Sequence, residues 1–454
     1  APPSRKPIVV LPNEKLKRMQ LGRRPFTAAL LGATVASSGS VNDHDANTAG
    51  TNMKSTLDLS KFGTALFNRV LSGEPAGGNV LLSPLSVARS LALAASGATP
   101  GSDAEVQLLG ALGASGAGEV PRLAAELLSS SRLEGEAGGG GVDLKMASSV
   151  WTAGVKDGFV ETVRSVHAAQ AEGLPETYAP LNDWIEEETD GSISAMFDPE
   201  KKVDPLTRAL LVDAVRFKGS WTQRFDPDKT KAGTFTAQVG TDESTGAPVG
   251  EEREAQFMNE KRKMKVRDRM EQLGDAAVLR LDYGEAPVAE SDGSPPSPLE
   301  YCALLVLPSD PSPGAMTKAA EGLESTPLSQ VLDGLWPRDV VLSLPKFRLD
   351  WGTSTLVPAL RSMGVKAPFD GTGMFEPMSD DPDVHLDDVL HKAAIEVTEE
   401  GTVAAAATVG VIMSRSLPPP PLELTFDRPF LMAILHVPTK TPLFLGRVSD
   451  PELQ

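Results

Sequence analysis

The chain of 454 residues is long enough to bury a large core, and at roughly 100–200 residues per domain its length allows two to four domains. Its formal net charge of −18 argues against a nucleic-acid binder, which needs a basic face for phosphates. The single cysteine, Cys302, excludes an intrachain disulfide framework, the five scattered histidines lack metal-ligand spacing, and no apolar run approaches the roughly 20 residues of a membrane span, so we expect no metal, no cofactor and no membrane span.

The charge is unevenly distributed along the chain. The first 25 residues hold seven basic residues and one acidic residue, a net charge of +6 that leaves −24 for the remainder. An apolar stretch at 26–36 and small residues at 37–39 follow, which is the order of a secretory signal. A disordered basic tail is the alternative. We expect a basic, flexible leader over residues 1–55 and a secreted protein, with a cytoplasmic location as the alternative.

The first ordered elements are expected from Thr56 onward. Apolar residues from Leu59 to Val70 recur at helical spacing, and Gly73 ends the run. A short strand is expected at 80–82. Ser83 then has the character of an N-cap followed by proline at the first helical position, which predicts a helix that ends at Gly97.

Further along the chain, loops and strands alternate. Residues 127–141, 239–255 and 286–299 are rich in glycine, proline or acidic residues, which predicts loops. Short apolar runs predict strands at Ala276–Leu281, Cys302–Leu307, Val340–Leu344, Phe430–Val437 and Pro442–Val448. Helices therefore dominate the first half and strands the second, which favours an α+β fold. Cys302 lies in one of the apolar runs and is expected to be a buried core residue.

Motifs of the C-terminal third carry a family resemblance. His391–Pro451, with LTFDRPFLMAI at Leu424–Ile434, resembles the serpin family of serine protease inhibitors. Five shorter blocks follow the family order: NVLLSPLSVARSLALAASGA (79–98), LNDWIEEETDGSI (181–193), FKGSW (217–221), LPKF (344–347) and MGV (363–365). The resemblance covers residues 56–454. It implies one serpin domain with three β-sheets, about eight or nine helices and an exposed reactive-centre loop at about 399–421.

The segment after Thr398 is composed of small residues. On its own, the alanine run at 404–407 predicts a helix or a flexible linker. The resemblance implies instead the proximal hinge of a loop that inserts into a sheet as a strand. Small side chains suit insertion into a preformed core, whereas large or charged ones oppose it. The hinge residues are then Glu399, Gly401, Thr402, Val403, Ala404, Ala405, Ala406 and Ala407.

The family spacing also implies a cleavage site. In inhibitory serpins the hinge glycine lies fourteen residues before the residue that fills the primary pocket of the protease. From Gly401 that residue is Arg415, so the reactive bond is Arg415–Ser416. Arginine fits a pocket with an acid at its base, as in trypsin-like proteases; the alternative is an ordinary surface arginine. Neighbouring subsites would receive Val411, Ile412, Met413, Ser414 and Leu417.

Other positions match the family's switch regions. The resemblance assigns Asp213 to the shutter, where the family usually has asparagine, and pairs Glu399 with a breach lysine. A carboxylate donates a hydrogen bond only when it is protonated, so the shutter network is expected to differ here. A satisfied core pair of Asp213 and His391 is the simpler alternative. The six shutter and breach residues are Ser83, Ser86, Asp213, His391, Trp221 and Lys346.

A basic stretch, 261–269, has alternating character and is expected on a strand. The helical region at 104–126, which carries the polyanion site in some serpins, has almost no basic residues. We therefore favour a solvated strand face over a glycosaminoglycan site. The expected partner is a trypsin-like serine protease held in a covalent complex, and the inhibitor itself is expected to be a monomer.

Two further classes of protein compete with a protease inhibitor. A non-inhibitory serpin that acts as a carrier, chaperone or storage protein is disfavoured by the uninterrupted small-residue hinge and by Arg415. A hydrolase with a Ser/His/Asp set is disfavoured because the chain has no GxSxG motif. We expect that the protein is not an enzyme and supplies no catalytic residue.

Overall fold

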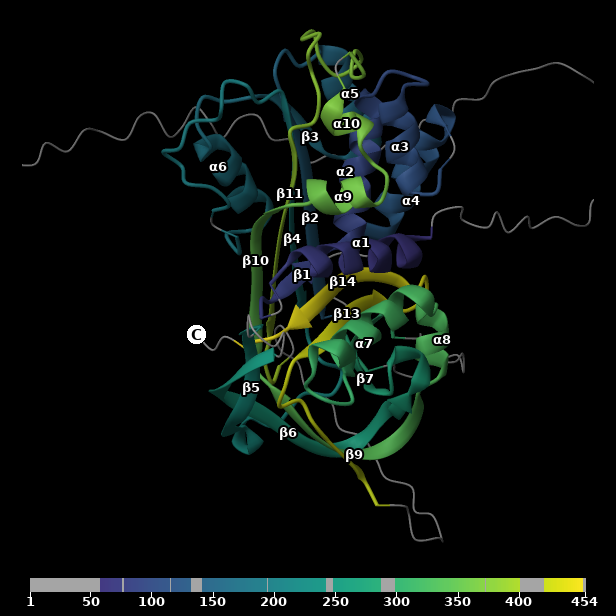
Figure 1. The fold of residues 1–454 in the computed structure, drawn as a ribbon, viewed down its shortest axis with the longest axis vertical. Coiled ribbons are helices and arrows are strands. Elements are labelled where there is room, and N and C mark those ends of the chain that lie inside the picture. The colour runs from purple at the N-terminus through teal and green to yellow at the C-terminus, as the bar shows by residue number, and fades with distance from the viewer. Residues whose placement is uncertain are drawn as a thin grey trace, which may run out of the picture. The chain divides into compact units, whose positions relative to one another are not determined.

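The computed structural model describes residues 58–451, with gaps at 76, 115, 132–140, 194, 242–247, 287–298, 372 and 401–419. The expected leader, 1–55, lies outside the described residues. Within these ranges the chain forms ten α-helices and two hydrogen-bonded sheets of nine and five strands (Figure 1).

The first two helices form for the local reasons that the sequence indicates. In α1 (Leu59–Gly73) the Asp58 carboxylate caps the helix by accepting from the Lys61 amide at 2.9 Å. In α2 (Pro84–Gly97) the Ser83 hydroxyl accepts from the Ser86 amide, and proline occupies the first turn. The other helices are α3 (Asp103–Ala111), α4 (Val120–Ser131), α5 (Asp157–His167), α6 (Ala179–Glu188), α7 (Pro313–Ser325), α8 (Leu328–Asp333), α9 (Val357–Ser362) and α10 (Ala367–Asp370).

The five-stranded sheet contains the regions expected to act as the switch. Its strand order is β10 (Phe347–Thr355), β11 (Asp388–Val397), β4 (Ala209–Gly219), β2 (Val142–Thr152) and β3 (Gln170–Gly173). The central strand β4 is buried on both faces except at Lys218. Strands β11 and β4 pair in parallel from Asp388↔Leu210 to Ala394↔Arg216, so no strand stands between them over this length.

The larger network is organised around one long strand, β6 (Pro248–Met270). It pairs with β5 (Lys231–Thr241) through its first part and with β9 (Trp336–Pro345) and β7 (Ala276–Tyr283) further along. This continuity joins the described strands into two networks where three sheets are expected. The remaining strands of the path are β1 (Val80–Leu82), β8 (Tyr301–Leu307), β12 (Leu422–Thr425), β13 (Phe430–His436) and β14 (Thr441–Val448).

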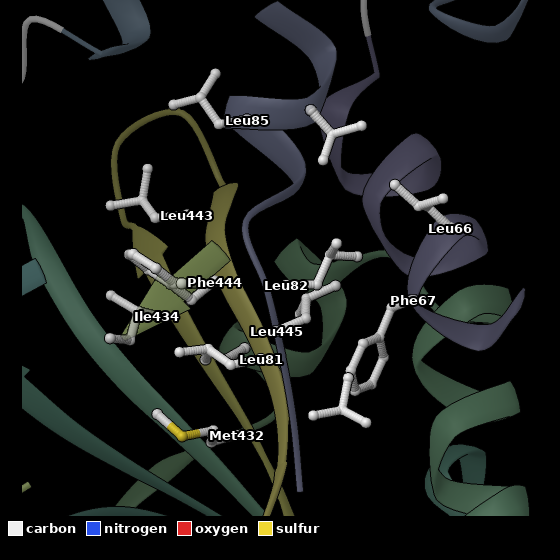
Figure 2. Close-up of a cluster of buried hydrophobic side chains, with 14 of the residues drawn as sticks. Leu66, Phe67, Leu81, Leu82, Leu85, Met432, Ile434, Leu443, Phe444 and Leu445 are labelled. Atoms are coloured by element: carbon white, nitrogen blue, oxygen red, sulfur yellow. The ribbon is translucent and has the colours of Figure 1, made fainter. Parts of the chain in front are cut away.

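The core joins the first helices to the last strands. Figure 2 shows Leu66 and Phe67 of α1, Leu81 and Leu82 of β1 and Leu85 of α2 beside side chains of β13 and β14. All five are no more than 1% exposed. Burial of such a side chain contributes about 1.5–3 kcal/mol, so this contact between the two ends of the domain is a major source of stability. The labelled partners from β13 and β14 are Met432, Ile434, Leu443, Phe444 and Leu445.

Most expected elements are confirmed, including α1, β1, α2 and the five C-terminal strands, and the α+β class holds. The expected loop at 239–255 is wrong at both ends, because backbone pairing continues β5 to Thr241 and begins β6 at Pro248, while 242–247 lies outside the described residues. The acidic side chains of 251–254 remain in solvent on this hairpin, so their charge does not oppose the strand. The expected loop at 127–141 is also wrong at its start, since α4 continues to Ser131. Strands β2 and β4 add sheet structure to the first half.

Candidate functional site

The end of β11 is held by the segment that follows β4. The indole Nε1 of Trp221 donates to the Thr398 carbonyl at 3.0 Å, and the Trp221 amide donates to the Glu400 carbonyl at 3.1 Å. The Phe225 amide donates to the Glu399 carbonyl at 3.0 Å. Trp221 itself is 3% exposed and stacks on Tyr283, so a rigid aromatic platform fixes the backbone at 398–400.

The expected ion pair of Glu399 with Lys346 is present. The Lys346 Nζ lies 3.0 Å from one carboxylate oxygen of Glu399, and the Thr230 hydroxyl donates to the other at 2.8 Å. Partial burial alone would raise the pKa of Glu399, but the hydrogen bond from Thr230, a backbone hydrogen bond, and the hydrogen bond and charge of Lys346 together hold the pKa below its usual range. Lys346 keeps a third of its side chain in solvent, so we assign the pair at most about 1 kcal/mol.

We call Trp221, Lys346 and Glu399 the anchor. Close to the anchor, strands β11 and β4 stop pairing. Pairing between β11 and β4 ends at Ala394↔Arg216, although both strands continue. A cleft of about 320 Å³ lies at this point. Arg216 is buried at its edge, where its guanidinium lies 2.8 Å from both Asp143 and Asp190. The gap between the two strands is therefore lined by Gly191, Ser192, Arg216, Phe217, Lys218, Arg348, Ala394, Ile395 and Glu396.

A buried carboxylate lies further down the same pair of strands. One oxygen of Asp213, Oδ1, accepts from the hydroxyls of Ser86 at 3.2 Å, Ser90 at 2.6 Å and Ser148 at 2.9 Å. The other oxygen, Oδ2, has no hydrogen-bond partner among the described residues. Burial raises the pKa of Asp213 to about 6, although the three hydroxyl donors and the charge of Arg89 oppose the shift.

His391 is the register partner of Asp213 on β11. The Ser83 amide donates to its Nε2 at 3.0 Å, which leaves the proton of the neutral ring on Nδ1. Burial lowers the pKa of His391 to about 3, and Nδ1 has no partner in the described part of the chain. The alternative of a satisfied core pair is therefore wrong, since Asp213 and His391 each keep one buried polar atom unpaired.

The structure brings the expected site residues together in two places. Ser83, Ser86, Asp213 and His391 form the buried cluster, and Trp221, Lys346 and Glu399 form the anchor. The expected hinge beyond Glu399 and the expected reactive bond with its subsites lie outside the described residues: Gly401, Thr402, Val403, Ala404, Ala405, Ala406, Ala407, Val411, Ile412, Met413, Ser414, Arg415, Ser416 and Leu417.

Four residues that form hydrogen bonds in the two clusters were not predicted from the sequence: Ser90, Ser148, Thr230 and Thr398. Ser90 follows Ser86 by one helical turn, so the i,i+4 spacing would have placed both hydroxyls on one face of α2. Ser148, Thr230 and Thr398 carry no comparable signal, because only the tertiary fold brings them to Asp213, Glu399 and Trp221.

Three further expectations concern the cysteine, metal sites and membrane spans. Cys302 is buried and free, and burial raises the pKa of its thiol to about 12, which leaves it unreactive at neutral pH. In the described ranges no group of three His, Cys, Asp or Glu side chains has the geometry of a metal site. The helices of the same ranges are all too short or too polar to cross a membrane.

Comparisons with known proteins identify the class. Residues 58–451 match the family model "Serpin (serine protease inhibitor)". The chain is 32% identical over 398 residues to Serpin-ZXA of Oryza sativa subsp. japonica, covering 84% of this chain and 92% of that protein. It is 32% identical over 400 residues to human Serpin B8, covering 86% and 97%. The chain therefore belongs to the serpin family, whose members are in general protease inhibitors rather than enzymes.

Solved structures agree on the fold. The native, stressed conformation of Arabidopsis AtSerpin1 superposes with a TM-score of 0.71 at 25% identity, covering 89% of this chain and 100% of that one. Human thyroxine-binding globulin superposes with a TM-score of 0.70 at 22% identity, covering 88% and 98%. The fold thus occurs in proteins with different roles.

The buried carboxylate gives a pH-dependent prediction. Ionised Asp213 is less favourable in the native state than in the unfolded chain, because its pKa rises from 3.8 to about 6 on folding. Its contribution to stability is therefore full below about pH 4 and is lost as the pH rises through about 6, at a cost on the order of 3 kcal/mol. We expect Asp213→Asn to be more stable than the wild type at about pH 7.5 and to lose that advantage near pH 4.

The measurement is the urea midpoint of unfolding for the wild type and Asp213→Asn across this pH range. His391, His167 and His436 have lowered pKa values of about 3, 4 and 4, so they destabilise both proteins as the pH falls below about 6.5. Only the difference between the two proteins isolates Asp213. The exposed Asp183→Asn on α6 is the matched surface control for the same substitution. A constant difference for Asp213→Asn would contradict the raised pKa.

Proposed function

We propose that the protein is a suicide inhibitor of trypsin-like serine proteases, cleaved at Arg415–Ser416. The main supporting observation is that Trp221 and the other anchor residues fix the backbone at 398–400. This fixed backbone lies close to the point where the pairing of β11 and β4 ends. Small residues follow directly in the sequence, from Thr402 to Ala407. The segment proposed to insert as a strand therefore starts beside the two strands that would part, and its first residues, 402–407, bring no bulky or charged side chain into the sheet.

The proposed reaction uses the catalytic groups of the protease. Its serine attacks the carbonyl carbon of Arg415, the peptide bond to Ser416 breaks, and the amine of Ser416 leaves with the proton that the protease histidine supplies. The product is an acyl-enzyme in which Arg415 is esterified to the protease. In this proposal the serpin contributes the substrate bond and the conformational change that follows.

Insertion then separates β11 from β4. The inserted strand replaces the hydrogen bonds between Asp388–Ala394 and Leu210–Arg216 with two new ladders. Fourteen residues at about 3.3 Å each span roughly 45 Å, which carries the attached protease to the far end of the sheet. Distortion of its oxyanion hole at that position would prevent deacylation. The native state must be metastable and held by a kinetic barrier for this step to proceed.

A non-inhibitory serpin, acting as a carrier, chaperone or storage protein, is the second candidate. The similarity to thyroxine-binding globulin at 22% identity concerns the fold alone. Against this candidate stand the small-residue hinge and an arginine at the position that the family spacing assigns to the primary pocket. The reactive loop distinguishes the two candidates, because only an inhibitor needs a loop that can enter the sheet.

The remaining assignments rest on the sequence. We propose one serpin domain over 56–454 behind a basic leader, a monomer in solution and a secreted protein, with the cytoplasm as the alternative. The order of basic, apolar and small residues in the first 39 positions supports secretion. A trypsin-like protease is the proposed partner because a long cation fits a primary pocket with an acidic base.

The direct test of the proposed function is incubation with trypsin, followed by denaturing gel electrophoresis and mass spectrometry. We expect a covalent complex that survives denaturation and a released C-terminal fragment beginning at Ser416. Clean cleavage at Arg415 without a stable complex would leave a substrate and reject the trap. A fragment with a different N-terminus would reject the assigned bond.

The hinge is tested by Thr402→Arg. This variant must bury an unpaired guanidinium in the sheet on insertion, which costs several kcal/mol. Loop insertion therefore becomes slower relative to deacylation. We expect most of the variant to be cleaved by trypsin as a substrate, with little complex. Thr402→Val, which is small and uncharged, should retain complex formation. Undiminished trapping by Thr402→Arg would show that residue 402 does not enter the sheet.

The primary specificity residue is tested by Arg415→Leu. Loss of the cation removes the partner of the acidic pocket base, so the inhibition rate constant should fall at least ~100-fold for trypsin and rise for chymotrypsin. Arg415→Lys keeps the charge and should remain a trypsin inhibitor. If Arg415→Leu inhibits trypsin as fast as the wild type, another residue occupies the pocket.

A further inference from the structure

One face of the long strand β6 carries a charge opposite to that of the protein as a whole. Alternate positions present basic side chains on the outer face, while Met264 and Val266 between them are 5% and 1% exposed. We call this set the β6 basic row: Lys261, Lys263, Lys265, Arg267 and Arg269. In a chain with a net charge of −18, a row of like charges needs an explanation beyond solubility.

The charges of the row are only partly neutralised. Arg269 pairs with Asp275 at 2.9 Å, and Arg267 stacks over the ring of Trp336 at 4.3 Å. Among the described residues, Lys261, Lys263 and Lys265 form no ion pair. Strand geometry places successive members about 6.8 Å apart, so the five cations span roughly 27 Å. The row is a linear positive surface with free ammonium groups at one end.

Exposed apolar side chains flank the same row. Trp336 and Val341 of β9 are 44% and 37% exposed, although large apolar residues are mostly buried in this fold. Val341 is the register partner of Lys261, and Trp336 is the register partner of Val266. Exposed tryptophan and arginine beside apolar contacts are typical of the residues that anchor protein–protein interfaces.

The row begins beside the strand that follows the proposed reactive loop. Glu423 of β12 is opposite Val341, which is opposite Lys261, so the three residues lie in one line across the sheet. Two strand spacings separate β12 from β6, a distance of about 10 Å. A protease bound at Arg415, seven residues before Leu422, therefore has the β6 basic row within reach of its surface.

We propose that the β6 basic row is a second contact surface for the target protease, which meets it with an acidic patch. This inference rests on the proposed function, since it needs a protease at the loop. A flexible polyanion fits less well, because it offers less apolar surface to the exposed Trp336 and Val341. The surface accelerates association and selects among proteases with the same primary pocket.

The test compares two charge-matched variants. Lys261→Glu/Lys263→Glu/Lys265→Glu reverses the free end of the row. Lys201→Glu/Lys202→Glu/Lys366→Glu changes the net charge equally at exposed lysines next to α6 and α10, which lie at the opposite end of the domain from β6 and β9 (Figure 1). The readout is the second-order rate constant for inhibition of an anionic and a cationic trypsin isoform, at about 0.05 M and 0.5 M salt.

With anionic trypsin at low salt, we expect the β6 variant to react at least ~10-fold more slowly than the control variant, and the gap to close at high salt. Cationic trypsin should show a much smaller gap. Trp336→Ala should slow association with little change in its salt dependence. The stoichiometry of inhibition should stay unchanged, because the row is not part of the inserting strand. Equal rate constants for the two triple variants would overturn the proposal.

A binding measurement separates this proposal from the trap itself. Trypsin with its catalytic serine replaced by alanine binds without forming an acyl-enzyme, so its Kd measures non-covalent binding by the loop and the row together, and the two triple variants differ only in the row. We expect the β6 variant to bind at least ~10-fold more weakly than the control variant. If the β6 variant binds more weakly but the wild type forms no covalent complex, the contact surface is supported and the trap mechanism is rejected. Loss of heparin–agarose retention in the β6 variant, with unchanged protease binding, would assign the row to a polyanion and overturn the proposal.

Discussion

The direct pairing of β4 with β11 is the constraint on which the rest of this structure depends. It closes the five-stranded sheet from Asp388 to Ala394, and its end at Ala394 and Arg216 defines the cleft beside the anchor. The hydrogen bonds of Trp221 and the ion pair of Glu399 lie close to that end, where they fix the backbone at 398–400 that follows β11. A serpin that inserts its loop must exchange this pairing for another one.

The buried cluster lies on the same seam and adds a cost to its closed state. Three serine hydroxyls satisfy one oxygen of Asp213, whereas the other oxygen and the Nδ1 of His391 remain unpaired in the described structure. Such unpaired buried polar groups destabilise the state that contains them. A less stable closed state is what the proposed mechanism requires, because loop insertion needs a native state that is held by a kinetic barrier.

In the proposed mechanism, two parts of the inhibitor contact the protease. Arg415 would bind in the primary pocket, whereas the β6 basic row would contact an acidic surface outside that pocket. Short-range fit in the pocket determines which bond is cleaved, and long-range charge determines how often the partners meet. A protein with a net charge of −18 can present such a local positive row because screening limits its electrostatic field to about 8–10 Å at physiological salt.

Local signals in the sequence determined the elements whose causes are local. The Ser83 cap, the apolar period of α1 and the C-terminal apolar runs predicted their helices and strands, and the ordered motifs indicated the family. The β5–β6 hairpin escaped prediction because its acidic composition resembles a loop and its stability comes from pairing between strands. Only the tertiary structure decided that Ser148 reaches Asp213, that Thr230 reaches Glu399 and that the basic row lies two strands from β12. Those contacts join residues far apart in the chain, and their energies depend on burial and register, which no local pattern of residues encodes.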